Sequence, residues 1–218
     1  MKTKLYLVRH CQSMGNLQNV FQGQSEYGVS PIGEQQLALL SLRFRNIHLD
    51  AIYSSPLLRA VKTAEAIRAY HNNLSVTRLD DLKEIDVGEL EGRKLQGVFE
   101  GYPELAERWN EAPQDCVFPG GESTVQVYAR AKSALSSILK ESAGKTVVVT
   151  SHGFLLRNMV CALLKDDLQA LPMIRIGGNT SVSEFEISET GVKVVQMNDL
   201  SHLPAELKGD PHQYDLKK

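Results

Sequence analysis

Near the N-terminus runs Leu5-Tyr6-Leu7-Val8-Arg9-His10-Cys11-Gln12-Ser13-Met14-Gly15-Asn16, the stretch that decides the fold. Residues 4–8 form a short apolar run with a β-branched and an aromatic member, which is typical of a buried strand of a parallel sheet. Arg9 and His10 follow the run directly, and Gly15 and Asn16 suit a turn. Because open α/β sheets bind ligands outside the carboxyl ends of their strands, these polar groups face the expected position of an active site.

The composition is that of an ordinary soluble globular protein, with 42% hydrophobic and 23% charged residues over a length of 218. The formal net charge of -2 gives no overall basic field, so we expect neither a nucleic-acid partner nor binding to a membrane surface. The 3 cysteines form no CxxC pair, and no apolar stretch approaches the roughly 20 residues that span a bilayer. No signal-peptide h-region precedes the first strand, so a cytoplasmic location is expected.

Predicted strands and helices alternate along most of the chain. The pattern predicts strands at residues 51–53, 75–79, 145–150, 181–187 and 192–197, and helices at about 31–47, 57–70, 123–144 and 154–164. Ser30-Pro31 and Ser55-Pro56 each combine an N-cap serine with a proline at the first helical position. The order predicts an α/β fold, a three-layer sandwich in which helices cover both faces of a mostly parallel sheet with an antiparallel edge.

Three segments lie outside this regular pattern. Residues 17–29 are expected to form a loop, and residues 93–121, with several prolines and one tryptophan, a lid-like excursion with short helices. Residues 199–218 form a polar C-terminal tail without periodic signal. Because none of these segments has a core of its own, we expect residues 1–218 to form a single domain.

Three strand ends carry chemically useful side chains, namely Arg9 and His10, Ser54 and Ser55 with Arg59 just beyond, and Ser151 and His152. Right-handed crossovers place the ends of parallel strands at one edge of the sheet, so these groups can converge. Arg59 is expected in the first turn of a helix, where a cation opposes the helix dipole by about 0.3–1 kcal/mol. A bound anion would remove that conflict, and phosphate matches the guanidinium fork.

Five motifs in order carry a resemblance to a known family. They are Leu7-Val8-Arg9-His10-Cys11-Gln12-Ser13-x-x-Asn16, Ser54-Ser55-Pro56-Leu57-x-Arg59-Ala60-x-x-Thr63-Ala64, Glu84-x-x-x-Gly88-x-x-Glu91-Gly92, Pro119-Gly120-Gly121-Glu122-Ser123 and Ser151-His152-Gly153. With these motifs the sequence resembles the histidine phosphatase superfamily, which also contains the cofactor-dependent phosphoglycerate mutases. The match extends over nearly the whole chain.

The resemblance implies a catalytic role for each matched residue. His10 would attack phosphorus and form a phosphohistidine, and Glu84 would protonate the leaving group and then deprotonate water. The phosphoryl oxygens would be held by Arg9, Arg59 and His152, with Asn16 as a neutral donor. We expect the substrate to contact Ser13, Asn16, Gln22, Gly23 and Gly153. No metal and no cofactor is implied.

Two of these assignments leave alternatives open. Asp81, Asp86, Glu89 and Glu91 are near enough in sequence to compete with Glu84, and only the resemblance selects Glu84. A zinc site formed by His10, Cys11 and His152 is also conceivable, although it lacks the paired spacing usual for structural zinc.

Cys11 departs from the family, which usually has glycine at this position. Its side chain would either crowd the phosphate pocket or point into the sheet, and we favour the second interpretation. We further hypothesise that the cationic neighbours lower the pKa of the Cys11 thiol and open it to oxidation.

The function expected from the sequence is hydrolysis of a small phosphorylated metabolite by a metal-independent phosphomonoesterase. A phosphoglycerate mutase is the alternative enzyme. The mutases share a longer insertion after the motif that begins at Glu84, whereas this chain has only the compact segment 93–118 there. A phospho-ligand-binding protein without turnover is the alternative of another class. A homodimer through an edge strand or a helix face is compatible with the pattern.

Overall fold

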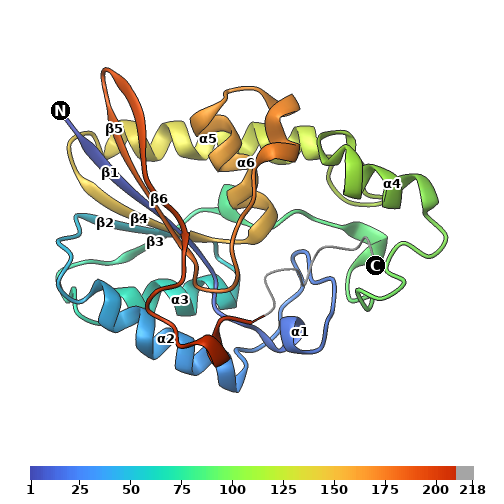
Figure 1. The fold of residues 1–218 in the computed structure, drawn as a ribbon, viewed down its shortest axis with the longest axis horizontal. Coiled ribbons are helices and arrows are strands. Elements are labelled where there is room, and N and C mark those ends of the chain that lie inside the picture. Colours follow the sequence, from blue (N-terminus) through green and yellow to red (C-terminus); the bar gives the residue numbers. More distant parts are fainter. Residues whose placement is uncertain (210–218) are drawn as a thin grey trace.

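The computed structural model describes residues 1–209 and is organised around one six-stranded sheet (Figure 1). Its strands are β1 (Thr3–Arg9), β2 (Ala51–Ser54), β3 (Val76–Arg78), β4 (Thr146–Ser151), β5 (Val182–Ser188) and β6 (Gly191–Asp199). They lie in the order β3-β2-β4-β1-β5-β6. The first four pair in parallel, whereas β5 runs antiparallel to both β1 and β6. The predicted parallel sheet with an antiparallel edge is therefore confirmed.

Helices cover both faces of this sheet. In Figure 1, α5 (Thr124–Glu141) and α6 (Gly153–Leu164) lie above the sheet, and α2 (Pro31–Phe44) and α3 (Leu58–Arg68) lie below it. Two short helices, α1 (Met14–Leu17) and α4 (Pro103–Glu111), belong to connecting segments. Single 3-10 turns occur at Asp80–Leu82, Gly88–Leu90, Pro113–Asp115 and Ala205–Leu207, and a longer one at Leu168–Met173. The three-layer prediction holds.

The core divides between the two faces of the sheet because side chains alternate along a strand. Leu5 and Leu7 of β1 join the cluster shared with α5 and α6, whereas Tyr6 and Val8 join the cluster that contains Phe44 of α2. Both faces of β1 are thus buried, which explains why its sequence is a continuous apolar run rather than an alternating one.

One predicted helix cap is correct and another is wrong. The Ser30 hydroxyl accepts from the Gly33 amide and caps α2, as expected. Ser55, in contrast, does not cap α3, which begins at Leu58 with Leu57 as its N-cap residue. The carboxylate of Glu26 caps α3 instead, because it accepts the Leu58 amide at 2.9 Å.

The segments expected to be irregular contain more structure than the sequence pattern indicates. The 17–29 loop is preceded by the single turn of α1, and residues 93–121 contain α4, which lies at one end of the molecule (Figure 1). Leu203 and Leu207 of the expected polar tail are buried, and Gln36 of α2 donates to the Leu207 carbonyl at 2.8 Å. The tail is therefore packed as far as Leu207, and residues 210–218 lie outside the described part of the chain.

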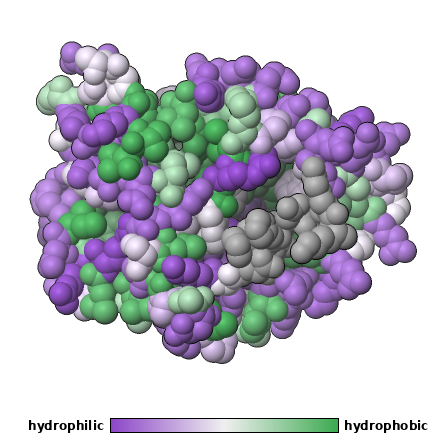
Figure 2. Space-filling model, in the orientation of Figure 1, coloured by the Kyte–Doolittle hydropathy of each residue, from purple (hydrophilic) through white to green (hydrophobic). Residues whose placement is uncertain are grey.

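No helix within residues 1–209 combines the length and the apolar character needed to cross a bilayer. Hydrophilic residues cover much of the face in Figure 2, and hydrophobic ones gather near the β5–β6 hairpin. Val194 and Val195 of the edge strand β6 are among the exposed hydrophobic residues. The expected homodimer stays a prediction.

Candidate active site

A cavity of about 350 Å³ lies where the predicted strand ends meet. Its lining includes Arg9 at the end of β1, His10 just after it, Arg59 from the first turn of α3, Glu84, and Gly153 at the start of α6. Parallel pairing explains the convergence, because Arg9 at the end of β1 lies beside Ser151 at the end of β4. The groups that the sequence places at separate strand ends are thus brought to one edge of the sheet.

His10 is held with one ring nitrogen committed to the backbone. Its side chain is buried, and Nδ1 lies 2.7 Å from the Cys11 carbonyl oxygen. Since a carbonyl can only accept, Nδ1 carries the proton and Nε2 keeps its lone pair. Burial, together with the charges of Arg59 and Arg9, lowers the pKa of His10 well below its ordinary value of about 6.5. The ring is therefore neutral at pH 7 and nucleophilic at Nε2.

His152 lies beside this nucleophile, with its ring centroid 5.1 Å from that of His10. Its Nε2 is 2.8 Å from the Ser55 hydroxyl, which also accepts the Leu57 amide at 3.2 Å. Burial and the charge of Arg59 lower the pKa of His152, so its ring is neutral, and the ring carries its proton on Nδ1 when the Ser55 hydroxyl donates to Nε2. That Nδ1 is buried and has no hydrogen-bond partner within residues 1–209. His152 is not itself among the residues that line the cavity, so its expected role in holding the phosphoryl group stays a prediction.

Main-chain carbonyls orient both predicted arginines. The guanidinium of Arg59, only 1% exposed, donates to the carbonyls of Gly23 at 2.7 Å and Ser25 at 3.0 Å. Arg9 donates to the Gly177 carbonyl at 2.8 Å. Because both arginines depress the pKa of both imidazoles, the site has the positive potential that favours a phosphoryl group.

Glu84 reaches the cavity from the loop after β3 and also meets the N-terminus of α6. Its carboxylate accepts the amides of Phe154 at 3.1 Å and Leu155 at 3.0 Å, and the Ile85 amide at 3.0 Å. Helix N-terminal amides suit a carboxylate because they are otherwise unsatisfied. The same helix start that carries Gly153 therefore holds Glu84 in place.

The competing carboxylates are placed elsewhere. None of Asp81, Asp86, Glu89 and Glu91 lines the cavity. Glu89 accepts from the Tyr102 hydroxyl at 2.6 Å, and Glu91 accepts the Gln24 amide at 2.8 Å. The geometry thus gives a physical reason to choose Glu84.

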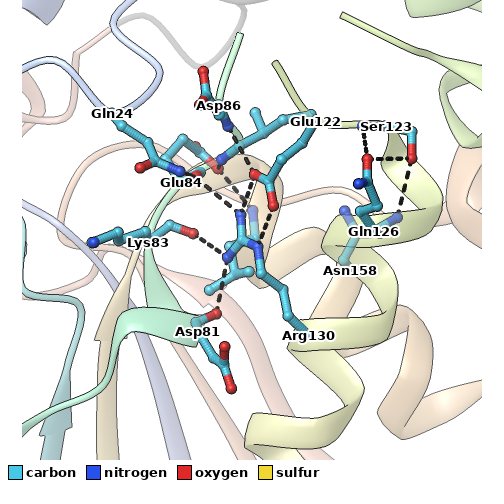
Figure 3. Close-up of polar contacts among 12 residues, drawn as sticks. Gln24, Asp81, Lys83, Glu84, Asp86, Glu122, Ser123, Gln126, Arg130 and Asn158 are labelled. Atoms are coloured by element: carbon cyan, nitrogen blue, oxygen red, sulfur yellow. Dashed lines mark hydrogen bonds and ion pairs between the residues drawn. The ribbon is translucent and has the colours of Figure 1, made fainter. Parts of the chain in front are cut away.

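An ion pair that the sequence reading missed supports the Glu84 loop (Figure 3). Arg130 of α5 donates to both carboxylate oxygens of Glu122 at 2.8 Å. The same guanidinium donates to the carbonyls of Asp81 at 2.9 Å, Lys83 at 2.6 Å and Glu84 at 3.0 Å. The sequence contains one signal that could have indicated this position. Arg130 comes three residues after the buried Val127, so it lies on the inward face of the helix.

The predicted substrate-binding residues fall into two groups. Gln22, Gly23 and Gly153 line the cavity, whereas Ser13 and Asn16 do not. Ser13 and Asn16 form the capping box of α1, and the Ser13 hydroxyl lies 2.6 Å from Gln22 Oε1. Their contact with the cavity is thus indirect, through the orientation of Gln22.

Cys11 does not line the cavity, so it does not crowd the predicted phosphate pocket, and its sulfur lies against α3. Its side chain is fully buried, and its sulfur lies 3.8 Å from the Arg59 carbonyl. The hypothesis of an acidic, oxidation-prone thiol is wrong, because burial raises its pKa to about 11 and outweighs the lowering by Thr63 and Arg59. Within residues 1–209 no three His, Cys, Asp or Glu side chains are grouped as metal ligands.

Ten lining residues lie beyond the predicted site residues, among them Arg157 and Arg175, and also Trp109 and Asn110 from the segment 93–118. Trp109 stacks on Phe154 with ring centroids 5.1 Å apart. The cavity therefore has an apolar wall and further cationic groups beyond the residues predicted to bind phosphate.

Known proteins are similar to this chain in sequence and in fold. The family model of the histidine phosphatase superfamily (branch 1) matches residues 5–200. Phosphoserine phosphatase 1 of Hydrogenobacter thermophilus is 40% identical over 92% of this chain and 94% of its own length. A probable phosphoglycerate mutase, GpmB of Salmonella choleraesuis, is 32% identical over 93% of this chain and 95% of its own.

Among solved structures, Bacillus stearothermophilus YhfR superimposes with a TM-score of 0.85 at 29% identity, over 92% of this chain and 98% of its own. The family match extends across all five motifs, and the similarity to the curated relatives runs nearly end to end. This chain belongs to the histidine phosphatase superfamily.

Proposed function

We propose that this chain, a phosphatase of the histidine phosphatase superfamily, hydrolyses small phosphate monoesters through a phosphohistidine at His10 and without a metal ion. The observation that carries the proposal is the state of His10, which is neutral, with Nδ1 bonded to the Cys11 carbonyl and Nε2 left for attack. Arg9, Arg59 and Glu84 line the same cavity. Together these groups supply a nucleophile, an anion clamp and a proton donor.

In the first step, Nε2 of His10 attacks phosphorus while the bond from phosphorus to the ester oxygen breaks. The protonated carboxyl of Glu84 gives its proton to the departing oxygen, so the leaving group departs as a neutral alcohol. Arg9, Arg59 and Nδ1–H of His152 donate to the phosphoryl oxygens as their charge redistributes. The products of this step are the alcohol, the phosphohistidine and ionised Glu84.

In the second step, Glu84 takes a proton from a water molecule as the water oxygen attacks phosphorus. The phosphorus–nitrogen bond breaks, its electron pair returns to Nε2, and inorganic phosphate leaves. His10 is then neutral and Glu84 protonated, as at the start. All charge stabilisation comes from protein side chains, so the cycle requires no metal ion.

Hydrolysis is favoured over phosphoryl return to another hydroxyl by the compact segment 93–118 beside the cavity. The mutase stays the second candidate because several relatives carry the name of a probable phosphoglycerate mutase. Phosphoserine and phosphoglycerate, which occur in the names of relatives, are the first esters to test.

The experiment is phosphate release from a panel of small monoesters in excess EDTA, with wild type, His10→Ala and His48→Ala. The His48 side chain is 82% exposed, which makes it the matched control. We expect turnover in EDTA by wild type and by the control, and none by His10→Ala. Acid-labile labelling of wild type by radioactive substrate would mark the phosphohistidine. Retained ligand binding with no turnover on any ester would refute the enzyme proposal in favour of a binding protein.

A further inference from the structure

Two arginines line the cavity apart from the pair that the phosphoryl group would occupy. Arg157 comes four residues after Gly153 on α6, so it lies on the same helix face and about 6 Å further along the axis. Arg175 follows the 3-10 helix Leu168–Met173 and lines the same cavity. A group bound near Arg157 would therefore lie roughly one helical turn from a phosphoryl group at the start of α6.

Neither arginine has an acidic partner within residues 1–209. Nε of Arg157 donates to the Leu171 carbonyl at 3.2 Å, and Nη1 of Arg175 donates to the Pro172 carbonyl at 2.6 Å. Burial, with the nearby charge of Arg175, lowers the pKa of Arg157 to about 10. Both guanidiniums are thus charged at neutral pH and repel each other.

Arg157 is partly buried and Arg175 is exposed, so the repulsion is costly mainly for Arg157, unless a counter-charge reaches it. Each guanidinium keeps N–H groups beyond those bonded to the carbonyls, and the open space beside both is the cavity. An anion there would offset the repulsion and accept these donors. Asn110, also in the lining, can add a neutral hydrogen bond.

Part of the cavity lining is apolar, and three of these apolar residues, Phe21, Trp109 and Phe154, are aromatic. Phe21 and Trp109 pack edge to face with centroids 5.6 Å apart, and Trp109 stacks on Phe154. Ile174 and Ile176 complete this side. Such a wall favours an apolar body in the leaving group over a polyhydroxylated one, because burying hydroxyl groups without partners is costly.

We propose that Arg157 and Arg175 form a subsite for a carboxylate carried by the leaving group, and so select phosphate monoesters with an apolar body and a second negative charge. The inference rests on the proposed phosphatase function. A carboxylate matches the guanidinium fork, and it is smaller than a second phosphate in a cavity of about 350 Å³ that also holds the phosphoryl group and the body.

Matched substrate pairs test the subsite. 3- and 4-carboxyphenyl phosphate are compared with the corresponding carbamoylphenyl phosphates, which have similar shape and no second charge. We expect wild type to prefer at least one carboxylate ester by tenfold or more in kcat/KM. In Arg157→Gln and Arg175→Gln this ratio should fall towards one, whereas Arg157→Lys should keep part of it. Arg68→Gln, on α3 across the sheet, is the control and should keep the wild-type ratio.

The ratio within one variant is the readout, so a general loss of activity does not imitate the result. Hydrolysis of the carbamoyl esters with no carboxylate preference, or a preference that survives both glutamine variants, overturns the subsite. Should no ester be hydrolysed, the phosphatase proposal fails and binding decides the subsite. 4-(Phosphonomethyl)benzoate must then bind wild type at least tenfold more tightly than its carboxamide, measured by calorimetry, and equal affinity overturns the inference.

Discussion

Arg130→Met removes the guanidinium that holds the Glu84 loop while keeping most of the aliphatic stem. Five hydrogen bonds are lost, two to Glu122 and three to the carbonyls of Asp81, Lys83 and Glu84. The Arg130 and Glu122 side chains are 15% and 21% exposed. The pair is therefore largely shielded from solvent. After the substitution, the Glu122 carboxylate would still accept the Asp86 amide at 2.9 Å but would lose its cationic partner.

Breaking a buried pair by removing one partner costs about 3–5 kcal/mol of unfolding free energy. The residual exposure of both groups places the expected loss near the lower end, at about 3 kcal/mol. For a chain of 218 residues this corresponds to a fall in Tm of about 6–12 °C.

The same substitution should affect the chemical step, because the main chain of Glu84 would lose the hydrogen bond from Arg130 that holds it in place. A displacement of about 1 Å at a reacting group costs roughly a hundredfold in rate. KM should change less, since His10 and Arg59 are held by other elements. The loss in kcat should be larger for an alkyl phosphate than for 4-nitrophenyl phosphate, whose leaving group needs little protonation.

The assay combines urea unfolding with steady-state kinetics on the two esters. Arg108→Met of α4 is the matched control, because that side chain is 49% exposed and lies 3.8 Å from Glu104. We expect the control to change the unfolding free energy by less than about 0.5 kcal/mol. An Arg130→Met protein within 1 kcal/mol of wild type, or equal loss of kcat on both esters, would refute the positioning role.

Three further outcomes follow from single contacts. DTNB should react with no thiol of the native protein at pH 7.5, because Cys11, Cys116 and Cys161 are all buried and burial raises the pKa of each, that of Cys11 to about 11; rapid labelling of any of them contradicts this. Burial and Arg43 lower the pKa of His202 to about 4, so the unfolded state takes up the proton as pH falls below about 6.5. The unfolding free energy of wild type should therefore fall between pH 7 and pH 5. In His202→Asn this fall, measured by urea unfolding at both pH values, should be smaller by roughly 1–2 kcal/mol. Glu26→Ala removes the cap of α3 and should lower the unfolding free energy by about 0.5–1 kcal/mol, measured by thermal unfolding. An unchanged Tm would show that the cap does not contribute to stability.

The phosphate end of the site could be predicted because its groups follow strands directly. Arg9 and His10 come at the last residue of β1 and just after it, and His152 comes immediately after β4, which pairs with β1 in parallel. The end of a short apolar run predicts the end of a buried strand to within a residue, and the carboxyl ends of neighbouring parallel strands lie at the same edge of the sheet. Glu84 is different, because no sequence period selects it among nearby carboxylates, and its reach to the start of α6 exists only in the fold.

Two expectations failed where a tertiary contact outweighed local chemistry. Ser55 has the sequence of an N-cap, yet its hydroxyl lies against Nε2 of His152 and α3 starts later. Cys11 has cationic neighbours in sequence and in space, yet it lies in a fully buried position where the thiolate would lose its hydration. In both cases the sequence showed the group, and the fold determined its partner.

The leaving-group end of the cavity shows where sequence reasoning stops. Arg157 could have been predicted, because it comes four residues after Gly153 and so lies one turn further along the same face of α6. Arg175 could not, because it follows a 3-10 helix that contains Pro172 and has no period to extend. Trp109 belongs to a short helix of the 93–121 excursion, and its stacking on Phe154 joins segments remote in sequence. A site can thus be extended along a regular element, while residues contributed by irregular segments become visible only once those segments are folded against it.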